Sequence, residues 1–401
     1  MYDGAGIRDP FATLRVRVKE LASSALVSTV AGEFRDELMN PCGIAALAEA
    51  GFLGMCLPPH YGGGGQDYRA LAVLCEELGR VDTAHQITVT VHLALVALAI
   101  LQWGTEEQRD RWLPQLASGD RFATFALTEP GTGSDVGALI ASAKRDGDGW
   151  ILNGEKAWIS HADLADTVLV FATGDPSLRH RGITAFLVDT GTPGLTSTRY
   201  RGKLGIRAGS TGSLVMQDVR VGPDALLGRE GEGFAVALAA LGNGLYTVGA
   251  GAVGVAQAAL DATVAMLRDD SIVGSPGPPP EWLAARLSVM ASGVERARLL
   301  INQAGDLKNR GQPSARETSL AKWQAAEIAS ESCLAALEVR DTLGLPADQT
   351  IERMLANVKG SVIFGGTREI HTGMQGAYAL GYRIERPFRC PAPTASDLAG
   401  L

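Results

Sequence analysis

The sequence predicts an α+β protein in three segregated parts, with helices first, strands in the middle and helices again at the end. Apolar residues recur at helical spacing in the first part, and short apolar runs between Gly and Asp turns then replace them. The helical period returns from Gly231. A chain of 401 residues is longer than one hydrophobic core usually serves. We therefore expect helical, β and helical domains at residues 1–120, 121–232 and 233–387, and a surface tail at 388–401.

The first part is predicted to be helical throughout. Apolar residues at helical spacing mark a helix over 68–78, with Gly79 as its stop signal. Thr105 is expected to cap the next helix, because Gln108 follows it at the spacing of a capping box. The most apolar stretch, 87–103, is about one turn shorter than a typical membrane span and contains polar residues. We therefore expect a buried core helix there and no membrane partner.

Strands and long helices are expected in the other two parts. Asn153–Gly154 is typical of a tight hairpin turn, and Gly274–Pro280 is typical of a loop. Strands are expected where β-branched and aromatic residues gather, at 122–127, 150–153, 167–171, 184–188 and 214–221. Helices are expected at 233–268, 280–309, 314–340 and from 350 onward.

Composition excludes some classes of protein. The net charge of −8 and the lack of a basic stripe argue against a nucleic-acid partner. The five cysteines are odd in number, and no pair of them has the spacing of metal ligands. We therefore expect no metal site and a reduced, cytoplasmic protein with buried thiols. The first residues contain no basic segment followed by an apolar run, so no signal peptide is expected.

Two segments carry candidate binding chemistry. The first, Phe125-Ala-Leu-Thr-Glu-Pro-Gly-Thr-Gly-Ser-Asp135, leaves a strand at Leu127 and continues as a loop with two glycines and several hydroxyl side chains. Such a loop offers N–H and O–H donors to an anion or to the polar edge of a ring, although a simple β-turn has the same residues. The second segment is Leu152-Asn-Gly-Glu-Lys-Ala-Trp-Ile-Ser160, in which Trp158 offers a ring for stacking on a flat cofactor and Ser160 offers a hydrogen bond. A core tryptophan is the alternative for Trp158.

Together these segments resemble the acyl-CoA dehydrogenase family, whose pattern is Thr-Glu-Pro-Gly-x-Gly-Ser-Asp followed by Trp-Ile-Ser. Similar segments extend over most of the chain, at Lys203–Arg207, Asp218–Val221, Leu226–Phe234 and Gly249–Gln257. The resemblance implies an N-terminal helical domain, a middle β-barrel-like domain and a C-terminal four-helix bundle. It also implies a homotetramer or homodimer that binds one FAD per subunit.

The resemblance assigns roles to individual residues. Ser160 would lie near N5 of the flavin, and Ser134 would also approach the thioester substrate. The residues that would line the flavin and its phosphates are Phe125, Leu127, Thr128, Gly133, Ser134, Trp158, Ile159, Ser160, Thr367 and Glu369. These roles require the two segments to lie together in the β domain, with room beside them for a planar ring system.

The chain departs from the family at the catalytic base. Family members remove the α-proton of an acyl thioester with a glutamate, and the β-hydrogen passes as hydride to the flavin. The glutamate belongs to a motif resembling Tyr-Glu-Gly-Thr-Ser, and Gly365 takes its position here. In some relatives the base is on an earlier helix, where the matching residue is Gly244 and the arginine that usually follows is Leu245. Neither position has a side chain that accepts a proton, so the catalytic residue is unknown.

The half of the flavin site that a neighbouring subunit supplies in the family is also altered. Its Arg-x-Thr-Phe segment falls on Asp270–Val273, where an acidic residue would repel a phosphate. Its Gln-x-x-Gly-Gly segment becomes Glu338–Thr342, and the following Arg-Asp becomes Ala356–Asn357.

Three side chains are candidate replacement bases, Tyr246, His371 and His161. A tyrosine is a poor base with its usual pKa near 10, whereas a histidine titrates in a useful range. A lone histidine is more often structural, and we favour a structural role for all three.

Four functions stay open. The first is FAD-dependent dehydrogenation of an acyl thioester, carried by coenzyme A or by an acyl-carrier protein, with a substituted base. The second is a flavin-dependent monooxygenase on the same fold, which needs no glutamate. The third is a non-catalytic subunit of a heteromeric acyl-CoA dehydrogenase. The fourth, ranked last, is non-redox chemistry without a flavin.

Overall fold

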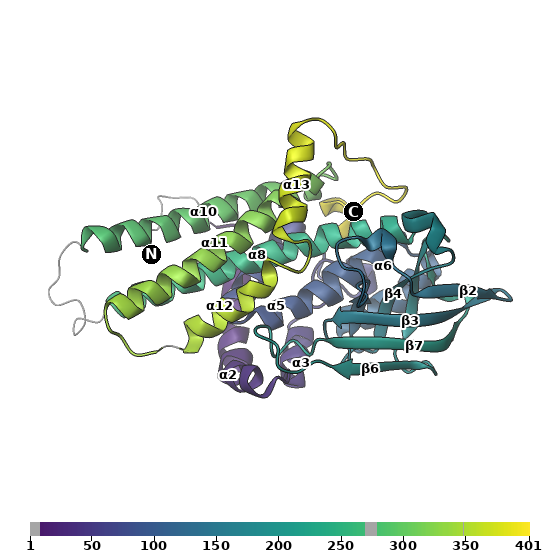
Figure 1. The fold of residues 1–401 in the computed structure, drawn as a ribbon, viewed down its shortest axis with the longest axis horizontal. Helices are drawn as coiled ribbons and strands as arrows, with labels where there is room; N and C mark the ends of the chain where they lie inside the picture. Colours follow the sequence, from purple (N-terminus) through teal and green to yellow (C-terminus); the bar gives the residue numbers. More distant parts are fainter. Residues whose placement is uncertain (1–8, 269–278, 348) are drawn as a thin grey trace.

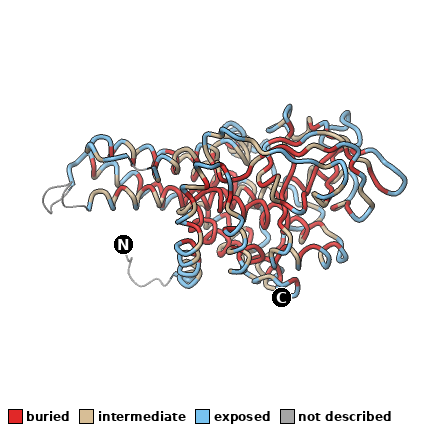
Figure 2. The backbone as a smooth tube through the Cα atoms, turned by 90° about the horizontal axis from the view of Figure 1, so that it is seen from below, coloured by how far each residue is buried: buried red, intermediate tan, exposed pale blue. Residues whose placement is uncertain are grey.

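The computed structural model describes residues 9–268, 279–347 and 349–401, and it confirms the α+β fold class. Helices form the N-terminal part, one mixed sheet forms the middle part, and long helices form the last part (Figure 1). The sheet lies at one end of the molecule, and the long helices extend away from it. Burial is greatest where the three parts meet (Figure 2).

The N-terminal part is helical, as predicted, and the capping box of Thr105 with Gln108 is present. The helix over 68–78 is also present, but it runs through Gly79 to Val81 instead of stopping. The helices are α1 (Ala12–Leu21), α2 (Val27–Asp36), α3 (Pro41–Glu49), α4 (Tyr68–Val81), α5 (Thr83–Val89), α6 (Leu98–Trp103) and α7 (Glu106–Ser118), with π-helical segments at Ala22–Leu26 and Thr90–Ala97.

Gly79 does not end α4 because its missing side chain serves helix packing. A Cβ at Gly79 would lie 2.2 Å from the carbonyl oxygen of Gly251, which belongs to a helix of the last part. A Cβ at Gly254 would lie 1.9 Å from the carbonyl oxygen of Glu76, one turn earlier in α4. The two helices therefore touch backbone to backbone, which only glycine permits.

Two helical runs are long and apolar enough to cross a membrane by length and composition alone, Thr83–Trp103 and Gly233–Leu267. In the first run, 94% of the most apolar window is buried inside the protein, and in the second 50% is buried. The first run is therefore the buried core helix that the sequence predicts.

The middle part is one eight-stranded mixed sheet in the order β6-β7-β3-β2-β4-β5-β8, with β1 parallel to β4. Its strands are β1 (Ala123–Ala126), β2 (Ser142–Asp146), β3 (Gly149–Ile159), β4 (Thr167–Thr173), β5 (Ile183–Asp189), β6 (Leu195–Arg199), β7 (Gly212–Val221) and β8 (Leu226–Leu227). The five predicted strands are present. The sequence does not predict β2 and β6 because both are short and largely exposed, so they have no apolar pattern.

Asn153–Gly154 is not a hairpin turn, contrary to the prediction. Both residues lie inside β3, where pairing with β7 shifts its register as in a β-bulge. Gly154 has a φ of +138°, and a Cβ there would lie 2.8 Å from Cα of Ala141. The turn between β2 and β3 instead joins Asp146 to Gly149.

The last part contains a four-helix bundle of α8 (Gly233–Leu267), α10 (Glu281–Asn309), α11 (Ala315–Thr342) and α12 (Gln349–Ser361). Helix α13 (Arg368–Ala379) stands out from the bundle (Figure 1). Of the predicted loop Gly274–Pro280, residues 274–278 lie outside the described residues. The predicted surface tail partly returns to the body, because it ends in α14 (Ala395–Ala399), in which Leu398 is fully buried.

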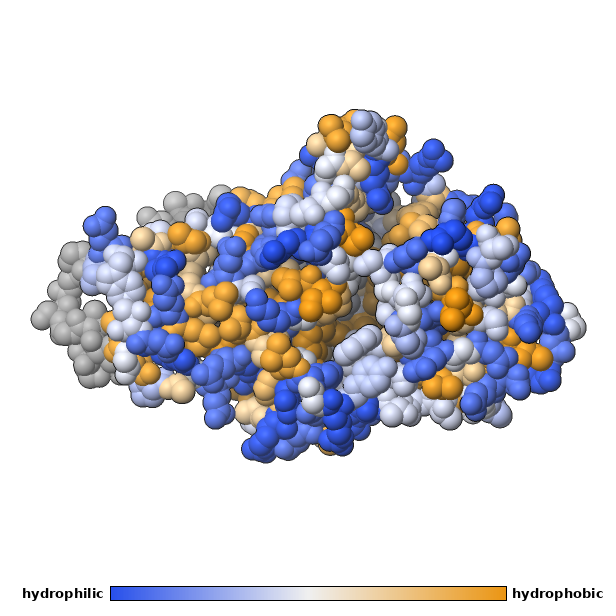
Figure 3. Space-filling model, viewed as in Figure 1, coloured by the Kyte–Doolittle hydropathy of each residue, from blue (hydrophilic) through white to orange (hydrophobic). Residues whose placement is uncertain are grey.

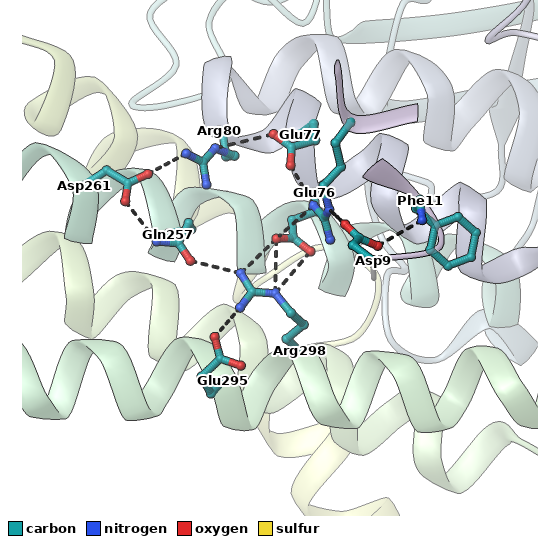
Figure 4. A network of polar contacts seen from close by, with 10 residues as sticks. Asp9, Phe11, Glu76, Glu77, Arg80, Gln257, Asp261, Glu295 and Arg298 are labelled. Carbon is teal, nitrogen blue, oxygen red and sulfur yellow. Dashed lines mark hydrogen bonds and ion pairs between the residues drawn. The ribbon is translucent and has the colours of Figure 1, made fainter. Parts of the chain in front are cut away.

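A polar network joins the N-terminal part to the bundle (Figure 4). Glu76 on α4 accepts a hydrogen bond from Arg298 on α10, with 2.9 Å between Nη2 and Oε1. Its neighbour Glu77 pairs with Arg15 on α1, with 2.6 Å between Oε1 and Nη1. Both carboxylates are nearly buried. The Glu76–Arg298 pair lies beside the glycine contacts between α4 and α8 and joins the same two parts, whereas the Glu77–Arg15 pair joins two helices of the N-terminal part.

Candidate active site

The two segments singled out in the sequence lie side by side. Ala157 on β3 donates its N–H to the carbonyl oxygen of Thr128, in the loop after β1, at 2.9 Å. At the other end, the Thr124 hydroxyl donates to the carbonyl oxygen of Ser160 at 2.6 Å. The end of β1 and the end of β3 are therefore bonded to each other, so the two segments lie together in the β domain, as a shared site requires.

A buried ion pair fixes this arrangement. Lys156 on β3 donates from Nζ to Oε1 of Glu129 at 2.7 Å and to the carbonyl oxygen of Leu127 at 3.1 Å. The Glu129 carboxylate also accepts the N–H groups of Ile140 and Ala141, at 2.7 and 2.9 Å. Burial lowers the pKa of Lys156 to about 8, and the charge of Glu129 opposes that shift. This pair was not predicted, although Glu129 lies in the first of the two segments and Lys156 lies in the second.

Trp158 presents its ring to the outside, so the core-tryptophan alternative is wrong. Its side chain is 64% exposed, and its backbone has a left-handed φ of +59°. The ring meets that of Tyr200 edge to face, with 5.2 Å between centroids. Ile159, the next residue, is buried, and Ser160 is half-buried. An open pocket adjoins the indole and is lined by Trp158, Arg199, Tyr200, Arg201, Gly202 and Lys203.

The loop after β1 is open at its glycines. Beyond their own neighbours, no described atom lies within 4 Å of the position of a Cβ at Gly131 or Gly133. Ser134 is exposed and Thr128 is half-buried. A tight turn shapes the loop, because Glu129 and Thr132 exchange backbone hydrogen bonds at 3.0 and 3.1 Å. The loop therefore offers N–H and hydroxyl groups at the surface, beside the strand end that carries Trp158.

The other residues assigned by resemblance fall in two places. Phe125 and Leu127 are buried in the core between the sheet and the helices, where the Phe125 ring packs against Phe171. Thr367 and Glu369 stand on the helical bundle instead, at the beginning of α13. A flavin role for these four residues stays a prediction.

The two positions expected for a base have different neighbours. Gly365 has a left-handed φ of +65°, and a Cβ there would lie 3.2 Å from Cδ2 of Leu245 on α8. Gly244, which precedes Leu245, packs against the π-helical segment Thr90–Ala97, because its Cβ would lie 2.6 Å from Cδ2 of Leu95. A side chain at Gly365 would therefore start beside α8 and α11, whereas a side chain at Gly244 would start against the π-helical segment.

A buried lysine that was not predicted from the sequence lies at the Gly365 turn. Lys322 on α11 donates from Nζ to the carbonyl oxygen of Gly366 at 2.8 Å, and its side chain is buried. Burial lowers its pKa to about 7, and the charge of Glu327 opposes that shift. A signal was present in the sequence, since Lys322 falls on the buried stripe of α11 that contains Thr318, Ala325 and Ala329.

The three predicted replacement bases are all enclosed in the protein. His161 is fully buried, contacts the Thr88 hydroxyl at 3.2 Å, and has its pKa lowered to about 3 by burial. Tyr246 donates its hydroxyl to the carbonyl oxygen of Tyr68 at 2.9 Å, and burial raises its pKa well above the usual value. These contacts agree with structural roles for both residues.

His371 lies against the Gly365 turn. Its Nδ1 is 2.8 Å from the Ser319 hydroxyl on α11, and a Cβ at Gly366 would lie 3.0 Å from its Nε2. Burial, and next the charge of Lys322, lower the pKa of His371 to about 4. The ring is therefore neutral near pH 7, and it packs against the turn at Gly365 and Gly366.

Two of the segments that match the half of the flavin site supplied by a neighbouring subunit in the family make ion pairs and hydrogen bonds within this chain. Glu338 and Arg340 lie near the end of α11 and pair with Arg286 at 2.7 Å and with Glu352 at 3.0 Å. Asn357 is buried, where it accepts the N–H of Ile206 at 2.6 Å. Asp270–Val273 lies outside the described residues.

Comparisons with known proteins cover most of the chain. Family models of the acyl-CoA dehydrogenase N-terminal, middle and C-terminal domains match residues 12–120, 124–219 and 231–379. The mitochondrial short-chain specific acyl-CoA dehydrogenase of Bos taurus is 36% identical over 370 residues, which are 92% of this chain and 90% of that protein.

Two solved structures extend this similarity. The prolyl acyl carrier protein oxidase AnaB superposes with a TM-score of 0.88 at 28% identity, over 93% of this chain and 100% of that one. A glutaryl-CoA dehydrogenase from Mycobacterium smegmatis in complex with FADH2 superposes with a TM-score of 0.87 at 29% identity, over 95% of this chain and 97% of that one.

Proposed function

The chain belongs to the acyl-CoA dehydrogenase family, and on this premise we propose that it is an FAD-dependent oxidoreductase that removes two hydrogens from an acyl thioester. The observation that carries the proposal is the hydrogen-bonded pairing of the loop at 128–134 with the strand end at 158–160. That pairing presents an exposed indole beside exposed loop N–H groups. A large aromatic ring is usually mostly buried, so its exposure here supports a binding surface.

The residues present fit a flavin. The open loop at Gly131 and Gly133 lets a phosphate approach the backbone closely, and the Ser134 hydroxyl adds a donor. Trp158, with Ile159 and Ser160 beside it, offers a flat apolar surface and a polar edge. A bound FAD supplies the two-electron acceptor that dehydrogenation needs and that no side chain offers.

We propose that the remaining assigned residues complete this site. Phe125 and Leu127 would back the ring from the core of the β domain. Thr367 and Glu369 would approach it from the bundle. The buried pair of Lys156 and Glu129 holds the loop and the strand in place.

The acyl group is carried either by coenzyme A or by a carrier protein in this proposal. Relatives of both kinds resemble the chain, since one is a short-chain acyl-CoA dehydrogenase and another is a prolyl acyl carrier protein oxidase. A panel of acyl-CoA thioesters and acyl-carrier-protein thioesters therefore tests the proposal. We expect the purified protein to contain flavin, and we expect its visible absorbance to bleach anaerobically with one class of thioester. Flavin that none of these thioesters bleaches would contradict the dehydrogenase assignment.

A monooxygenase is the second candidate, because Gly365 and Gly244 both lack a proton-accepting side chain. Its signature is oxygen insertion that depends on flavin reduced by a separate reductase. A non-catalytic subunit is the third candidate. It is favoured by the ion pairs that Glu338 and Arg340 make within the chain, because these two residues belong to a segment that matches part of the family's flavin site. Stable assembly with a second, base-bearing chain would identify that case.

We further propose a homodimer or homotetramer in the cytoplasm. Figure 3 shows apolar side chains over the bundle and at the far end of α13. Val289, Leu299 and Leu334 on the bundle and Leu380 after α13 are large apolar residues that are exposed in the single chain. Such surfaces favour association. The mass of the purified protein in solution tests this proposal.

A further inference from the structure

The Gly365 turn lies directly on the end of a buried lysine side chain. Lys322 is only 1% exposed, and its Nζ is 2.8 Å from the carbonyl oxygen of Gly366. A side chain at position 365 would begin 3.9 Å from Cε of Lys322 and 3.2 Å from Cδ2 of Leu245. The amine of Lys322 therefore lies beside the point at which the side chain of a glutamate at position 365 would begin.

Lys322 has no carboxylate within ion-pairing distance in the part of the chain that the structure describes. The contrast with Lys156 is direct, because that equally buried lysine has Glu129 at 2.7 Å. A buried ammonium without a counter-charge loses its hydration, so burial favours the neutral amine. The pKa of Lys322 is accordingly lowered to about 7, which leaves a large fraction of the amine neutral near that pH.

The groups that face this amine come from several elements. His371 on α13 packs against the Gly365 turn, and its lowered pKa leaves it uncharged near pH 7. Glu327, one and a half turns further along α11, pairs with Arg368 at the beginning of α13. On the side of α8, the neighbour of the turn is the apolar Leu245. No free carboxylate among these groups competes for the proton of Lys322.

We propose that the neutral amine of Lys322 is the base that removes the α-proton of the acyl thioester. In this step the Cα–H bond of the thioester breaks, and its electron pair stays on the thioester as the enolate. Nζ of Lys322 forms the new N–H bond and becomes an ammonium, which still donates to the carbonyl oxygen of Gly366. The inference rests on the proposed function, because it names the base for that reaction.

The glycine at position 365 suits this role. A Cβ at position 365 would already lie 3.2 Å from Cδ2 of Leu245 and 3.9 Å from Cε of Lys322, so a glycine there keeps further side-chain atoms away from the amine. Gly365 is itself partly exposed, so this turn is what separates the buried amine from the surface. A catalytic base of this kind contributes roughly 100- to 10,000-fold to the rate of proton transfer.

A purely structural lysine would also bond Gly366, and two substitutions separate the roles. Lys322→Arg keeps the charge and the hydrogen-bond donors but does not release its proton near neutral pH. Lys322→Gln keeps a neutral donor without a basic nitrogen. If Lys322 only positions the turn, at least one of these variants retains activity. If Lys322 is the base, both lose it.

The experiment measures exchange of the α-hydrogens of tert-butylacetyl-CoA with deuterium in D2O, using the flavin-containing protein as purified. This thioester has α-hydrogens but no β-hydrogen, so it cannot be dehydrogenated, and exchange reports proton transfer alone. We expect the natural chain to catalyse exchange at a rate that rises with pH through about 7. We expect at least an approximately 100-fold loss in Lys322→Arg and in Lys322→Gln. We also expect added ethylamine to restore exchange in Lys322→Ala, because it supplies the missing amine.

Exchange in the Arg or Gln variant within threefold of the natural rate would overturn the assignment. So would a natural chain that binds the thioester but does not exchange its α-hydrogens. A folded Lys322→Ala variant that ethylamine does not rescue would also overturn it. Circular dichroism and flavin content identify variants that fail to fold, and ethylamine rescue then decides the question with the variant that does fold. Failure of the proposed function looks different. Oxidisable thioesters would then leave the flavin unbleached, while Lys322-dependent exchange would persist.

Discussion

Nζ of Lys156 lies 2.7 Å from Oε1 of Glu129 inside the β domain, and both side chains are almost fully buried. This pair joins the loop after β1 to β3, the two segments that form the candidate flavin site. Removing one partner of a buried ion pair leaves the other charge without compensation, whereas removing both partners is much less harmful.

The first prediction concerns this pair. Lys156→Met should lower the free energy of unfolding by about 3–5 kcal/mol, because Glu129 is then buried alone. The double variant with Glu129→Leu should recover a large part of that loss. Urea unfolding followed by circular dichroism measures both. Arg286→Gln is the matched control, since it breaks the half-exposed pair with Glu338 and should leave stability nearly unchanged. Equal stability of Lys156→Met and the control would show that the pair holds nothing together.

Trp158→Ala should weaken flavin binding without lowering stability. The ring is 64% exposed, so its removal leaves the core intact, while a lost aromatic contact is worth about 0.5–1.5 kcal/mol. The dissociation constant of FAD should therefore rise roughly two- to tenfold, as measured by fluorescence titration of the flavin-free protein. Trp282→Ala, on α10 and 41% exposed, is the control and should bind FAD like the natural chain. The same affinity in both variants would place the flavin elsewhere.

Acid should destabilise the fold through His92. Its Nε2 donates to the carbonyl oxygen of Leu116, its Nδ1 accepts the N–H of Ala123, and burial lowers its pKa to about 4. Between pH 6.5 and about pH 4, the unfolded chain therefore binds a proton that the folded chain does not. Stability falls in that window as pH falls, by up to about 1.4 kcal/mol per pH unit.

Urea unfolding at several pH values checks this prediction. His92→Gln should show a shallower fall in stability between pH 6.5 and pH 4 than the natural chain, whatever its stability at neutral pH. His180→Gln is the control, because His180 is exposed and its loss should leave the pH profile as it is. Identical pH profiles for the natural chain and His92→Gln would contradict a neutral, buried His92.

Gly365→Glu should introduce a carboxylate base into the candidate site. The left-handed backbone at φ +65° costs a non-glycine residue about 1–2 kcal/mol, and Leu245 must move by a few tenths of an ångström. Gly365→Gln has the same strain and size but no basic group. With Lys322→Ala added to both variants, so that the proposed lysine base is absent, we expect thioesters to bleach the flavin at least 100-fold faster in the Glu variant than in the Gln variant, as measured by stopped-flow absorbance. Equal rates would mean that position 365 does not face the reacting carbon.

Gly79→Ala should be destabilising although alanine is the better helix former. A Cβ at Gly79 would lie 2.2 Å from the carbonyl oxygen of Gly251, so α4 and α8 must separate, at a cost of about 1–3 kcal/mol. Gly373→Ala is the control, because it lies in α13 with open space around it and should gain up to about 1 kcal/mol. Thermal unfolding of both variants gives the comparison, and shifts in the same direction would argue against the close contact.

Periodicity predicted most of the fold because it reports which face of each element is buried. The apolar run at 167–171 forms β4. One face of this strand packs against the helices through Leu169 and Phe171, and the other packs inside the β domain through Val168 and Val170. The two glycine signals that failed, Gly79 and Gly154, depend on partners elsewhere in the chain, and local sequence does not contain that information.

The candidate site was predicted only in part. The resemblance placed the loop after β1 beside the Trp158 strand end, and their hydrogen bonds agree with it. Two of the buried lysines, Lys156 and Lys322, were missed at the candidate site, because a lysine in a strand or helix is usually solvated. The position of Lys322 on a buried helical stripe is the one clue that the sequence held.

The glycine contacts between α4 and α8 limit how this molecule can open. Gly79 packs against the carbonyl oxygen of Gly251, and Gly254 packs against the carbonyl oxygen of Glu76. The side chain of Glu76 also accepts a hydrogen bond from Arg298. A hinge between the N-terminal helices and the bundle would have to break these backbone contacts and expose a buried charge at the same time. Movement of the Gly365 turn or of the β domain would leave these contacts intact, so it is the less costly way to admit and release a substrate.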